Sequence, residues 1–295
     1  MSGLMSVLAA TDGSEHGLGA VVTGAALAKR AGAEFHITTV VEVLLVPPAY
    51  IPPGVDAARY EPDFIREARE KAMDQAREAE AATAQLHVRA GFAPQLINKV
   101  AEEADADLIV VGANPQPARA RSLVGTTGRR VLYLANRPVL VASQARREPF
   151  RRVLAAVDLS EVSQVVLRNA WSVARADGAE LRALFVLEPL PMMLARVAGD
   201  KEEERRRHGR EQLVWVLESA DLVGEEAVGA HIRQGHAGRE ILEEANEWNA
   251  DLIVLGTHGF NFFDRLLLGS TSLYVLRHGQ LAMLVVPGVQ SREQQ

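Results

Sequence analysis

Spaced glycines in the second half of the chain have the composition of an anion-binding loop. Gly256 and Gly259 are separated by two residues, and nine residues later Gly269 precedes Ser270 and Thr271. Glycines allow positive φ and let backbone amides approach a phosphate without a Cβ in the way, so that successive N–H groups point at the anion. The hydroxyl groups of Ser270 and Thr271 supply two further donors. This spacing therefore predicts a phosphate-binding loop.

The position of the loop after an apolar run supports this prediction. Residues 251–255 indicate a buried strand, and the helix that begins at Gly269 offers free N–H groups and a dipole that favour negative charge. Ligands of open parallel sheets bind at the carboxyl ends of the strands, so Asp158, which ends another apolar run, should converge on the loop. The chain has no GxxxxGK[ST] pattern, which excludes a Walker-type ATPase.

An earlier copy of the loop indicates an internal duplication. Gly112 and Gly125 each precede their counterparts in the second half by 144 residues, but Pro115 replaces the second glycine. Proline has a fixed φ and no N–H, so it lacks both properties that the glycine provides. Loss of one amide donor to phosphate costs roughly 1.5 to 3 kcal/mol, or about 10- to 150-fold in affinity. We therefore expect the first site to be weak or empty.

The elements that position these residues repeat as well. Glycines at 32 and 178 are expected to end the first helix of each half. Alternating strands and helices predict a parallel sheet with right-handed crossovers in each half. The expected strands are 7–12, 34–42, 85–89, 107–111 and 139–141, then 153–158, 180–188, 228–232, 251–255 and 283–286. The expected helices are 14–31, 61–82, 94–104 and one after Gly125, then 160–176, 201–219, 238–248 and one after Gly269.

Composition and length bound the protein class. The 295 residues allow two domains, and we place them at 1–145 and 150–295, on either side of a polar stretch. A net charge of −6 gives no general attraction to nucleic acid, and the chain has no cysteine. No uncharged apolar stretch approaches the roughly 18 residues of a membrane span. We expect a soluble, cytoplasmic protein, and we interpret the charged run 202–207 as a solvated helix face with Glu202–Arg206 and Glu203–Arg207 pairs.

The glycine pattern resembles that of the universal stress protein family, and the similarity covers nearly the whole chain as two tandem copies. Nucleotide-binding members carry Gly, two residues, Gly, nine residues, Gly and then Ser or Thr, which Gly256, Gly259, Gly269 and Ser270 match. The resemblance implies an α/β fold of two tandem Rossmann-like domains of the adenine nucleotide alpha hydrolase-like type. Each would hold a five-stranded parallel sheet of order 3-2-1-4-5 flanked by helices. It also implies dimer-like pairing of domains through their last strands, in a homodimer or an intrachain pseudo-dimer.

The resemblance further implies the ligand and its contacts. Asp158 would contact the nucleotide or its Mg²⁺, and Val186 would lie against adenine. ATP is the expected ligand, with AMP or ADP as alternatives. The expected second site comprises Asp158, Val186, Gly256, Thr257, His258, Gly259, Gly269, Ser270 and Thr271. The first half keeps Asp12, Val40, Gly112, Gly125 and Thr126 at the matching positions.

Three functions fit these residues. The first is an ATP-binding stress-response regulator that acts through binding and through the arrangement of its domains or of an oligomer, because no residue set forms a convincing nucleophile and base. The second is an adenine-nucleotide enzyme, either a slow Mg²⁺-dependent ATPase or a nucleotidyl transferase. The transferases carry a His-x-Gly-His type signature after the first strand, which is missing after Asp12 and Asp158. The third is a protein-interaction module without a ligand.

Overall fold

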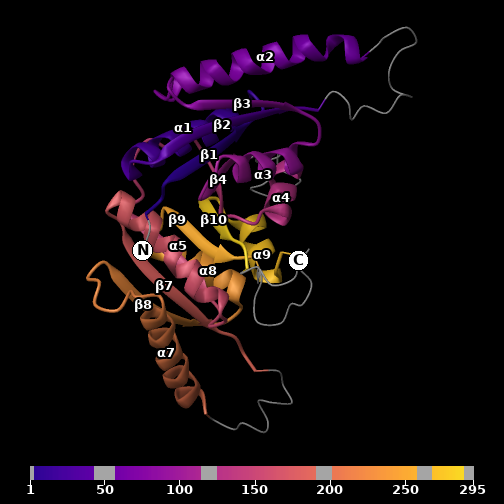
Figure 1. Cartoon of the computed structure of the whole chain (residues 1–295). Helices are drawn as coiled ribbons and strands as arrows, with labels where there is room; N and C mark the ends of the chain where they lie inside the picture. The colour runs from indigo at the N-terminus through magenta and orange to yellow at the C-terminus, as the bar shows by residue number, and fades with distance from the viewer. Residues whose placement is uncertain (1–2, 43–56, 114–124, 191–200, 258–267, 289–295) are drawn as a thin grey trace, which may run out of the picture. The chain divides into compact units, whose positions relative to one another are not determined.

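The chain folds as two compact units, Met1–Pro149 and Phe150–Gln295. A computed structural model describes residues 3–42, 57–113, 125–190, 201–257 and 268–288. In each unit strands and helices alternate along the chain (Figure 1).

Five parallel strands form the sheet of the first unit in the order β3-β2-β1-β4-β5. Its elements in chain order are β1 (Ser6–Thr11), α1 (Glu15–Ala31), β2 (Glu34–Val41), α2 (Ala57–Glu78), β3 (Gln85–Ala90), α3 (Ala93–Glu103), β4 (Leu108–Gly112), α4 (Thr126–Leu134) and β5 (Val139–Ala142).

The second unit repeats this order as β8-β7-β6-β9-β10, again with parallel pairing. Its elements are β6 (Arg152–Val157), α5 (Val162–Asp177), β7 (Glu180–Leu187), α7 (Glu202–Ser219), β8 (Val228–Gln234), α8 (Ala237–Glu247), β9 (Leu252–Gly256), α9 (Ser270–His278) and β10 (Ala282–Val286). The predicted α/β class and the 3-2-1-4-5 order are therefore confirmed in both units.

Helices cover both faces of each sheet, which explains why the central strands are continuous apolar runs. In the first unit α1 contacts α2 and α3 contacts α4; in the second, α5 contacts α7 and α8 contacts α9. Every residue of β1 is buried. The edge strand that stands first in each order, β3 or β8, is more exposed than the central strands and has a partly polar sequence. The carboxyl ends of β1 and β4, or of β6 and β9, consequently open at one edge.

The predicted stop signals are confirmed, whereas several boundaries differ. Gly32 and Gly178 end α1 and α5 with φ of 67° and 66°, the left-handed conformation that glycine adopts without a Cβ penalty. Helix α2 begins at Ala57 rather than at residue 61, so that Pro62 lies inside it. Strand β8 runs on to Gln234, two residues past the predicted end. Proline is favoured in the first turn of a helix but does not fix where α2 begins. The alternation of apolar and polar residues that marks a strand is weak in a polar edge strand such as β8.

A buried carboxylate links β7 and β8 to α8. Glu244 is 2% exposed, and its oxygens accept hydrogen bonds from Arg182 at 2.5 Å and from Arg233 at 3.0 Å. The guanidinium of Arg182 also lies over the Trp248 ring, 4.2 Å from its centroid. Burial raises the pKa of Glu244, but the hydrogen bonds from the two arginines outweigh it and hold the pKa below its ordinary value.

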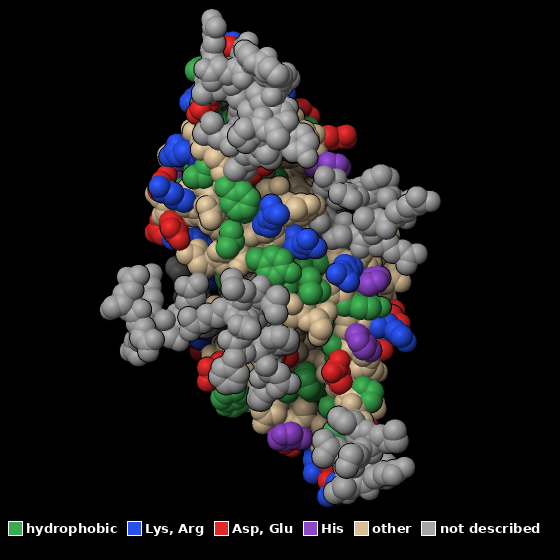
Figure 2. Space-filling view, turned by 90° about the vertical axis from the view of Figure 1, so that its right-hand side faces the viewer, with side chains coloured by type: hydrophobic (Ala, Val, Ile, Leu, Met, Phe, Trp, Pro, Cys, Tyr) green, Lys and Arg blue, Asp and Glu red, His purple; other side chains and the backbone are tan. Residues whose placement is uncertain are grey.

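The face of the molecule drawn in Figure 2 carries both signs of charge, with several basic side chains beside apolar ones near its middle and acidic side chains mainly toward its margins. Among the described helices, none combines the length and apolar character that a bilayer crossing requires.

We predict that Glu244→Gln lowers the free energy of unfolding by about 3 kcal/mol, because it removes the buried counter-charge of the partly buried Arg182. The folded-state pKa is depressed, so the stabilisation is present above the unfolded-state pKa of about 4.3 and is lost as the pH falls through the folded-state value. Denaturant unfolding between neutral and acidic pH measures both effects. Glu243→Gln is the matched control. The Glu243 side chain is 48% exposed, and its contact with Arg233 is longer, at 3.5 Å, so its loss should cost little. Equal losses in the two variants would contradict this account.

Candidate functional site

A cavity of about 430 Å³ opens at the carboxyl ends of β6, β7 and β9 in the second unit. Its size lies within the range of small-molecule sites. The wall also includes the first turns of α5, α8 and α9. The cavity is lined by Ala156, Val157, Asp158, Val162, Ser163, Val166, Leu184, Phe185, Val186, Leu187, Glu188, Arg205, Ala237, Ile241, Leu255, Gly256, Gly269, Ser270, Thr271 and Ser272.

Asp158 is fixed by the turn that follows β6. Its Oδ1 accepts hydrogen bonds from Ser160 N at 3.1 Å, Ser160 Oγ at 2.6 Å and Ser163 Oγ at 3.0 Å. Ser163 is almost fully buried, which holds the carboxylate against the start of α5. Among the described residues no hydrogen bond reaches Oδ2. The carboxylate therefore has one oxygen committed to the turn and one that faces no described donor.

The residue after Asp158 has an unusual backbone conformation. Leu159 has φ of 65°, in the left-handed region that disfavours residues with a Cβ. At the equivalent position of the first unit, Gly13 has φ of 79°. The turn therefore requires a positive φ in both units, and only the first unit meets it with glycine.

Thr257 joins β9, α9 and the end of β10. Its backbone N–H donates to Val286 O at 2.9 Å, and its carbonyl accepts from Gly269 N at 2.7 Å. The hydroxyl accepts from Gly288 N at 3.2 Å. In addition, Ser272 Oγ donates to Gly256 O at 2.6 Å. These bonds place the start of α9 directly beside the end of β9.

Within the part of the chain that the structure describes, no side chain caps the start of α9. Gly269 occupies the N-cap position without a side-chain hydrogen bond, and Ser270 and Thr271 line the cavity. The amides of a helix's first turn have no partners within the helix, so they present donors and a positive dipole end to the cavity.

The base of the cavity is apolar. Leu184, Val186 and Ile241 are buried and line it. Val186 and Leu184 lie on the same face of β7, two residues apart, and face α8. A flat apolar ring fits this surface, whereas the α9 end suits an anion.

Two charged residues of the cavity, Arg205 and Glu188, were not predicted from the sequence. Arg205 of α7 lines it and donates to Glu188 O at 2.8 Å and to Glu202 Oε2 at 3.2 Å. Helix α7 is therefore not wholly a solvated face, and the structure pairs Glu202 with Arg205 instead of Arg206 among the described residues. Glu188 Oε1 accepts from Ala237 N at 3.1 Å and so caps α8.

A sequence signal exists for Glu188 but not for Arg205. Glu42 in the first unit accepts from Ala93 N at 2.8 Å, capping α3 as Glu188 caps α8. Both glutamates directly follow the second strand of their unit, so the repeat itself marks the position. Arg205 stands in a run of three glutamates and three arginines, where sequence alone does not distinguish one member.

The structure brings together most of the predicted second site. Among the predicted residues that the structure describes, only Thr257 does not line the cavity. Its side chain is buried, and its polar groups bond to Val286, Gly269 and Gly288. His258 and Gly259 lie outside the described residues, as does Pro115 of the first copy. The predicted residues that line the cavity are Asp158, Val186, Gly256, Gly269, Ser270 and Thr271.

The first unit has a corresponding cavity of about 340 Å³. All five residues predicted for the weaker site line it, namely Asp12, Val40, Gly112, Gly125 and Thr126. Thr38 replaces the apolar Leu184 at its base, and the buried Thr38 hydroxyl has no described hydrogen-bond partner. The first unit therefore keeps the geometry of the site with a more polar floor.

Gly112 is required by packing in the first unit. A Cβ at this position would collide with the carbonyl oxygen of His16 and lie 3.3 Å from Gly17 N. The first turn of α1 thus packs directly on the backbone at the end of β4.

Within the described residues, no group of three or more His, Asp or Glu side chains is arranged to hold a metal ion.

Comparison with known proteins gives a consistent result. The universal stress protein family matches residues 4–143 and again residues 149–287. The solved structure of a universal stress protein from Archaeoglobus fulgidus is 25% identical, with a TM-score of 0.71 over 96% of this chain and 98% of that chain. A universal stress protein from Synechocystis is 26% identical over 153 residues, covering 46% of this chain and 97% of the relative. One from Methanocaldococcus jannaschii is 30% identical over 140 residues, covering 46% of this chain and 82% of the relative.

We predict that Gly13→Ala lowers the free energy of unfolding by about 1 kcal/mol, because alanine is strained at this positive φ. The new Cβ would also come within 2.9 Å of Lys71 Cδ, although that side chain is able to shift. Gly229→Ala is the control, since its nearest contact would be 3.9 Å and its φ is not positive. Denaturant midpoints measure both changes. A Gly13→Ala protein as stable as the control would remove the argument for an obligatory left-handed turn.

Proposed function

The chain belongs to the universal stress protein family, and from this premise we propose that it binds an adenine nucleotide, mainly in the second unit, and acts in stress response through binding rather than turnover. The observation that carries the proposal is the second-unit cavity. There an uncapped helix start, a carboxylate with one open oxygen and an apolar floor meet in about 430 Å³.

The α9 end of the cavity suits the phosphates. Gly256, Gly269, Ser270 and Thr271 line it, and the first-turn amides of α9 carry the positive end of the helix dipole. Two hydroxyl groups add donors to these amides. Adenine would lie at the other end, on Leu184, Val186 and Ile241, where its ring replaces water on an apolar surface.

Asp158 is suited to hold Mg²⁺ that arrives with the nucleotide. Magnesium is bound in such sites by one or two carboxylates together with substrate phosphates. The hydrogen bonds to Oδ1 fix the carboxylate, while Oδ2 is left for the cation. Magnesium would neutralise phosphate charge there.

Preference for the second unit follows from the loop residues. Gly259 permits an amide donor where Pro115 of the first copy has none. The roughly 1.5 to 3 kcal/mol for a lost donor corresponds to about 10- to 150-fold weaker binding in the first unit. The smaller first-unit cavity, 340 against 430 Å³, and its polar floor favour the same order.

The disposition of the acidic groups supports binding over catalysis. Asp158 and Glu188 are the acidic side chains among the described residues that line the cavity. Asp158 Oδ1 already accepts three hydrogen bonds, and Glu188 Oε1 caps α8. Both carboxylates thus have structural partners rather than the position of a general base beside a nucleophile.

We predict that purified wild-type protein releases an adenine nucleotide on denaturation and that Gly269→Val abolishes this, because a branched side chain blocks the approach of backbone to phosphate. Gly125→Val, the equivalent change in the first unit, should leave most of the nucleotide bound. Mass spectrometry of the released material and calorimetric titration with MgATP measure the difference. Gly259→Pro, which copies the first loop, should weaken ATP binding about 10- to 150-fold. Equal, tight occupancy of two sites per chain would refute the preference for the second unit.

We also expect ATP to change the assembly state, since a regulator without turnover must report binding through structure. Sedimentation velocity with and without MgATP measures this on the full chain. Gly269→Val provides the control, because it should sediment identically under both conditions. Identical profiles for wild-type protein with and without bound ATP would contradict a role through assembly.

A further inference from the structure

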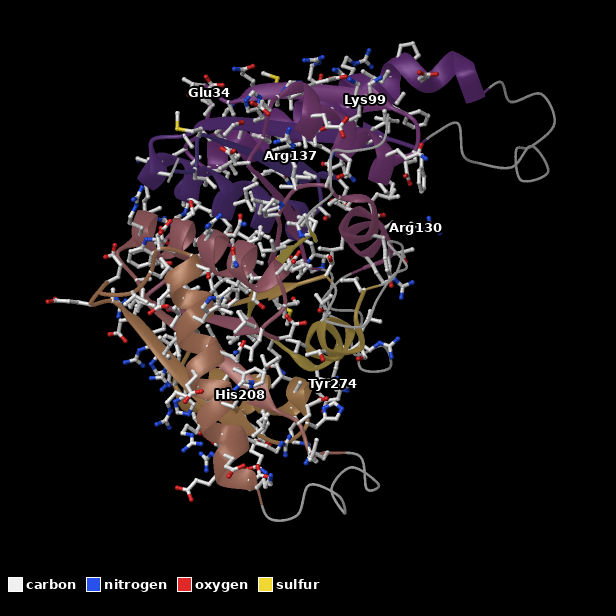
Figure 3. All side chains as sticks on the ribbon, turned by 60° about the horizontal axis from the view of Figure 1, so that its bottom comes forward. Glu34, Lys99, Arg130, Arg137, His208 and Tyr274 are labelled. Atoms are coloured by element: carbon white, nitrogen blue, oxygen red, sulfur yellow. The ribbon has the colours of Figure 1, made fainter. Side chains whose placement is uncertain are left out.

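A separate cavity of about 590 Å³ lies in the first unit between the C-terminal halves of α1 and α2. It is bordered by the starts of β2 and β3, whereas the nucleotide-type cavity lies at the carboxyl ends of the strands, and the two share no lining residue. The apolar part of its wall is formed by Phe35 and by small side chains that include Ala25, Ala28, Ala79 and Ala81. Glu34, labelled in Figure 3, stands at its rim at the start of β2.

The duplicated helix of the second unit carries a large side chain at the equivalent position. Gly32 and Gly178 end α1 and α5 in the same conformation, 146 residues apart. The same offset makes Trp171 the counterpart of Ala25. The Trp171 side chain is 7% exposed, so an indole ring is packed where the first unit has a single methyl group.

The ends of α2 and α7 show the same exchange. Ala81 N donates to Ala76 O at 2.8 Å, and Leu222 N donates to Leu217 O at 3.0 Å, so the two turns correspond with an offset of 141 residues. Leu222 is 1% exposed, so a buried isobutyl group stands at the position where the first unit has the methyl group of Ala81. At these two helix positions the first unit therefore has the smaller side chains, and both of them line its cavity.

The rim of this cavity is cationic. Lys29, Arg30 and Arg147 line it, against Glu34 and Glu80. The contacts of Lys29 Nζ and Arg147 Nη1 with Glu80 are long, 4.0 and 3.9 Å, and exposed. Exposed pairs of this length contribute little, so the Lys29 ammonium and the Nη1 side of the Arg147 guanidinium are able to meet an incoming anion.

Arg147 is positioned by the end of α2. Its Nη2 donates to Glu78 O at 2.7 Å, as Arg168 Nη2 donates to Ser219 O at 2.8 Å in the second unit. Arg168 belongs to α5, and its counterpart on α1 is Val22 by the 146-residue offset. In the first unit Arg147, which itself lines the cavity, therefore makes the hydrogen bond that the α5 arginine makes in the second unit, and α1 carries the shorter Val22 at that position.

We propose that this cavity binds a small aromatic carboxylate of indole size. The ring occupies the place of the Trp171 side chain, against Ala25 and Ala81, and the carboxylate pairs with Lys29 and Arg147. Burial of a flat apolar ring against the methyl walls supplies the attraction, and the cations select the anionic ligand over its neutral analogue.

Calorimetric titration of the full chain with indole-3-acetate tests the proposal. Wild-type protein should bind it, and 3-methylindole, which lacks the carboxylate, should bind at least about threefold more weakly. Ala25→Trp should reduce affinity at least about tenfold by filling the cavity as Trp171 fills the second unit. Ala81→Leu is a second, milder filling variant that copies Leu222. Both variants should keep their MgATP affinity, which separates this site from the nucleotide cavity.

Charge is tested by a matched pair. Lys29→Gln should weaken indole-3-acetate binding about two- to fivefold, while Arg175→Gln, the equivalent position on α5, should leave it unchanged. No binding by wild-type protein at millimolar indole-3-acetate would overturn the proposal. Equal binding by wild-type protein and both filling variants would overturn the location, and equal binding of 3-methylindole would overturn the selection of a carboxylate.

Discussion

The candidate site of the second unit depends on the hydrogen bonds made by Thr257. Its backbone joins β9 to β10 through Val286 and holds Gly269 at the start of α9, and its hydroxyl group holds Gly288. Twelve residues separate Gly256 from Gly269 in the sequence, so chain connectivity alone does not place the strand end beside the helix start. The hydrogen bonds of Thr257 keep the strand end and the helix start together, because the peptide groups that they pair are buried and costly to leave unpaired.

The duplication shows how far two copies diverge while keeping one topology. At equivalent positions the first unit has His36 and Val100, and the second has Arg182 and Glu244. In the first unit His36 Nδ1 lies 3.1 Å from His87 Nε2, and burial, followed by the neighbouring His36, lowers the pKa of His87. That unit thus favours an uncharged His87, while the second stabilises the buried Glu244 carboxylate with two arginines. The two units therefore share the strand order and pairing, whereas the side chains that link the second strand to the helix beside it differ.

Much of the fold was predictable from the sequence for identifiable reasons. Apolar runs marked the central strands because helices cover both their faces, and Gly32 and Gly178 marked helix ends because only glycine adopts that φ without strain. The strand order came from the resemblance to a family rather than from periodicity. The predicted start of α2 was wrong, because a proline in the first turns of a helix is compatible with several starting residues.

The site was predictable where it rests on backbone geometry and less so where it rests on side chains from distant segments. Glycines and strand-end aspartates converge because the topology brings the strand ends to one edge. Arg205 reaches the cavity from another helix, and Thr257 turns out to hold the structure together instead of facing the ligand. Such roles depend on which way a side chain points, which spacing alone does not specify.

The crowding of Gly112 against the backbone of α1 affects how the glycine motif is used to infer function. Natural selection would retain that residue even in a copy that had lost its ligand, because any larger side chain would force the helix away from the sheet. Its presence in a related sequence is thus a record of folding requirements. Surveys that sort family members into binders and non-binders should give it little weight and examine the position that Pro115 occupies here.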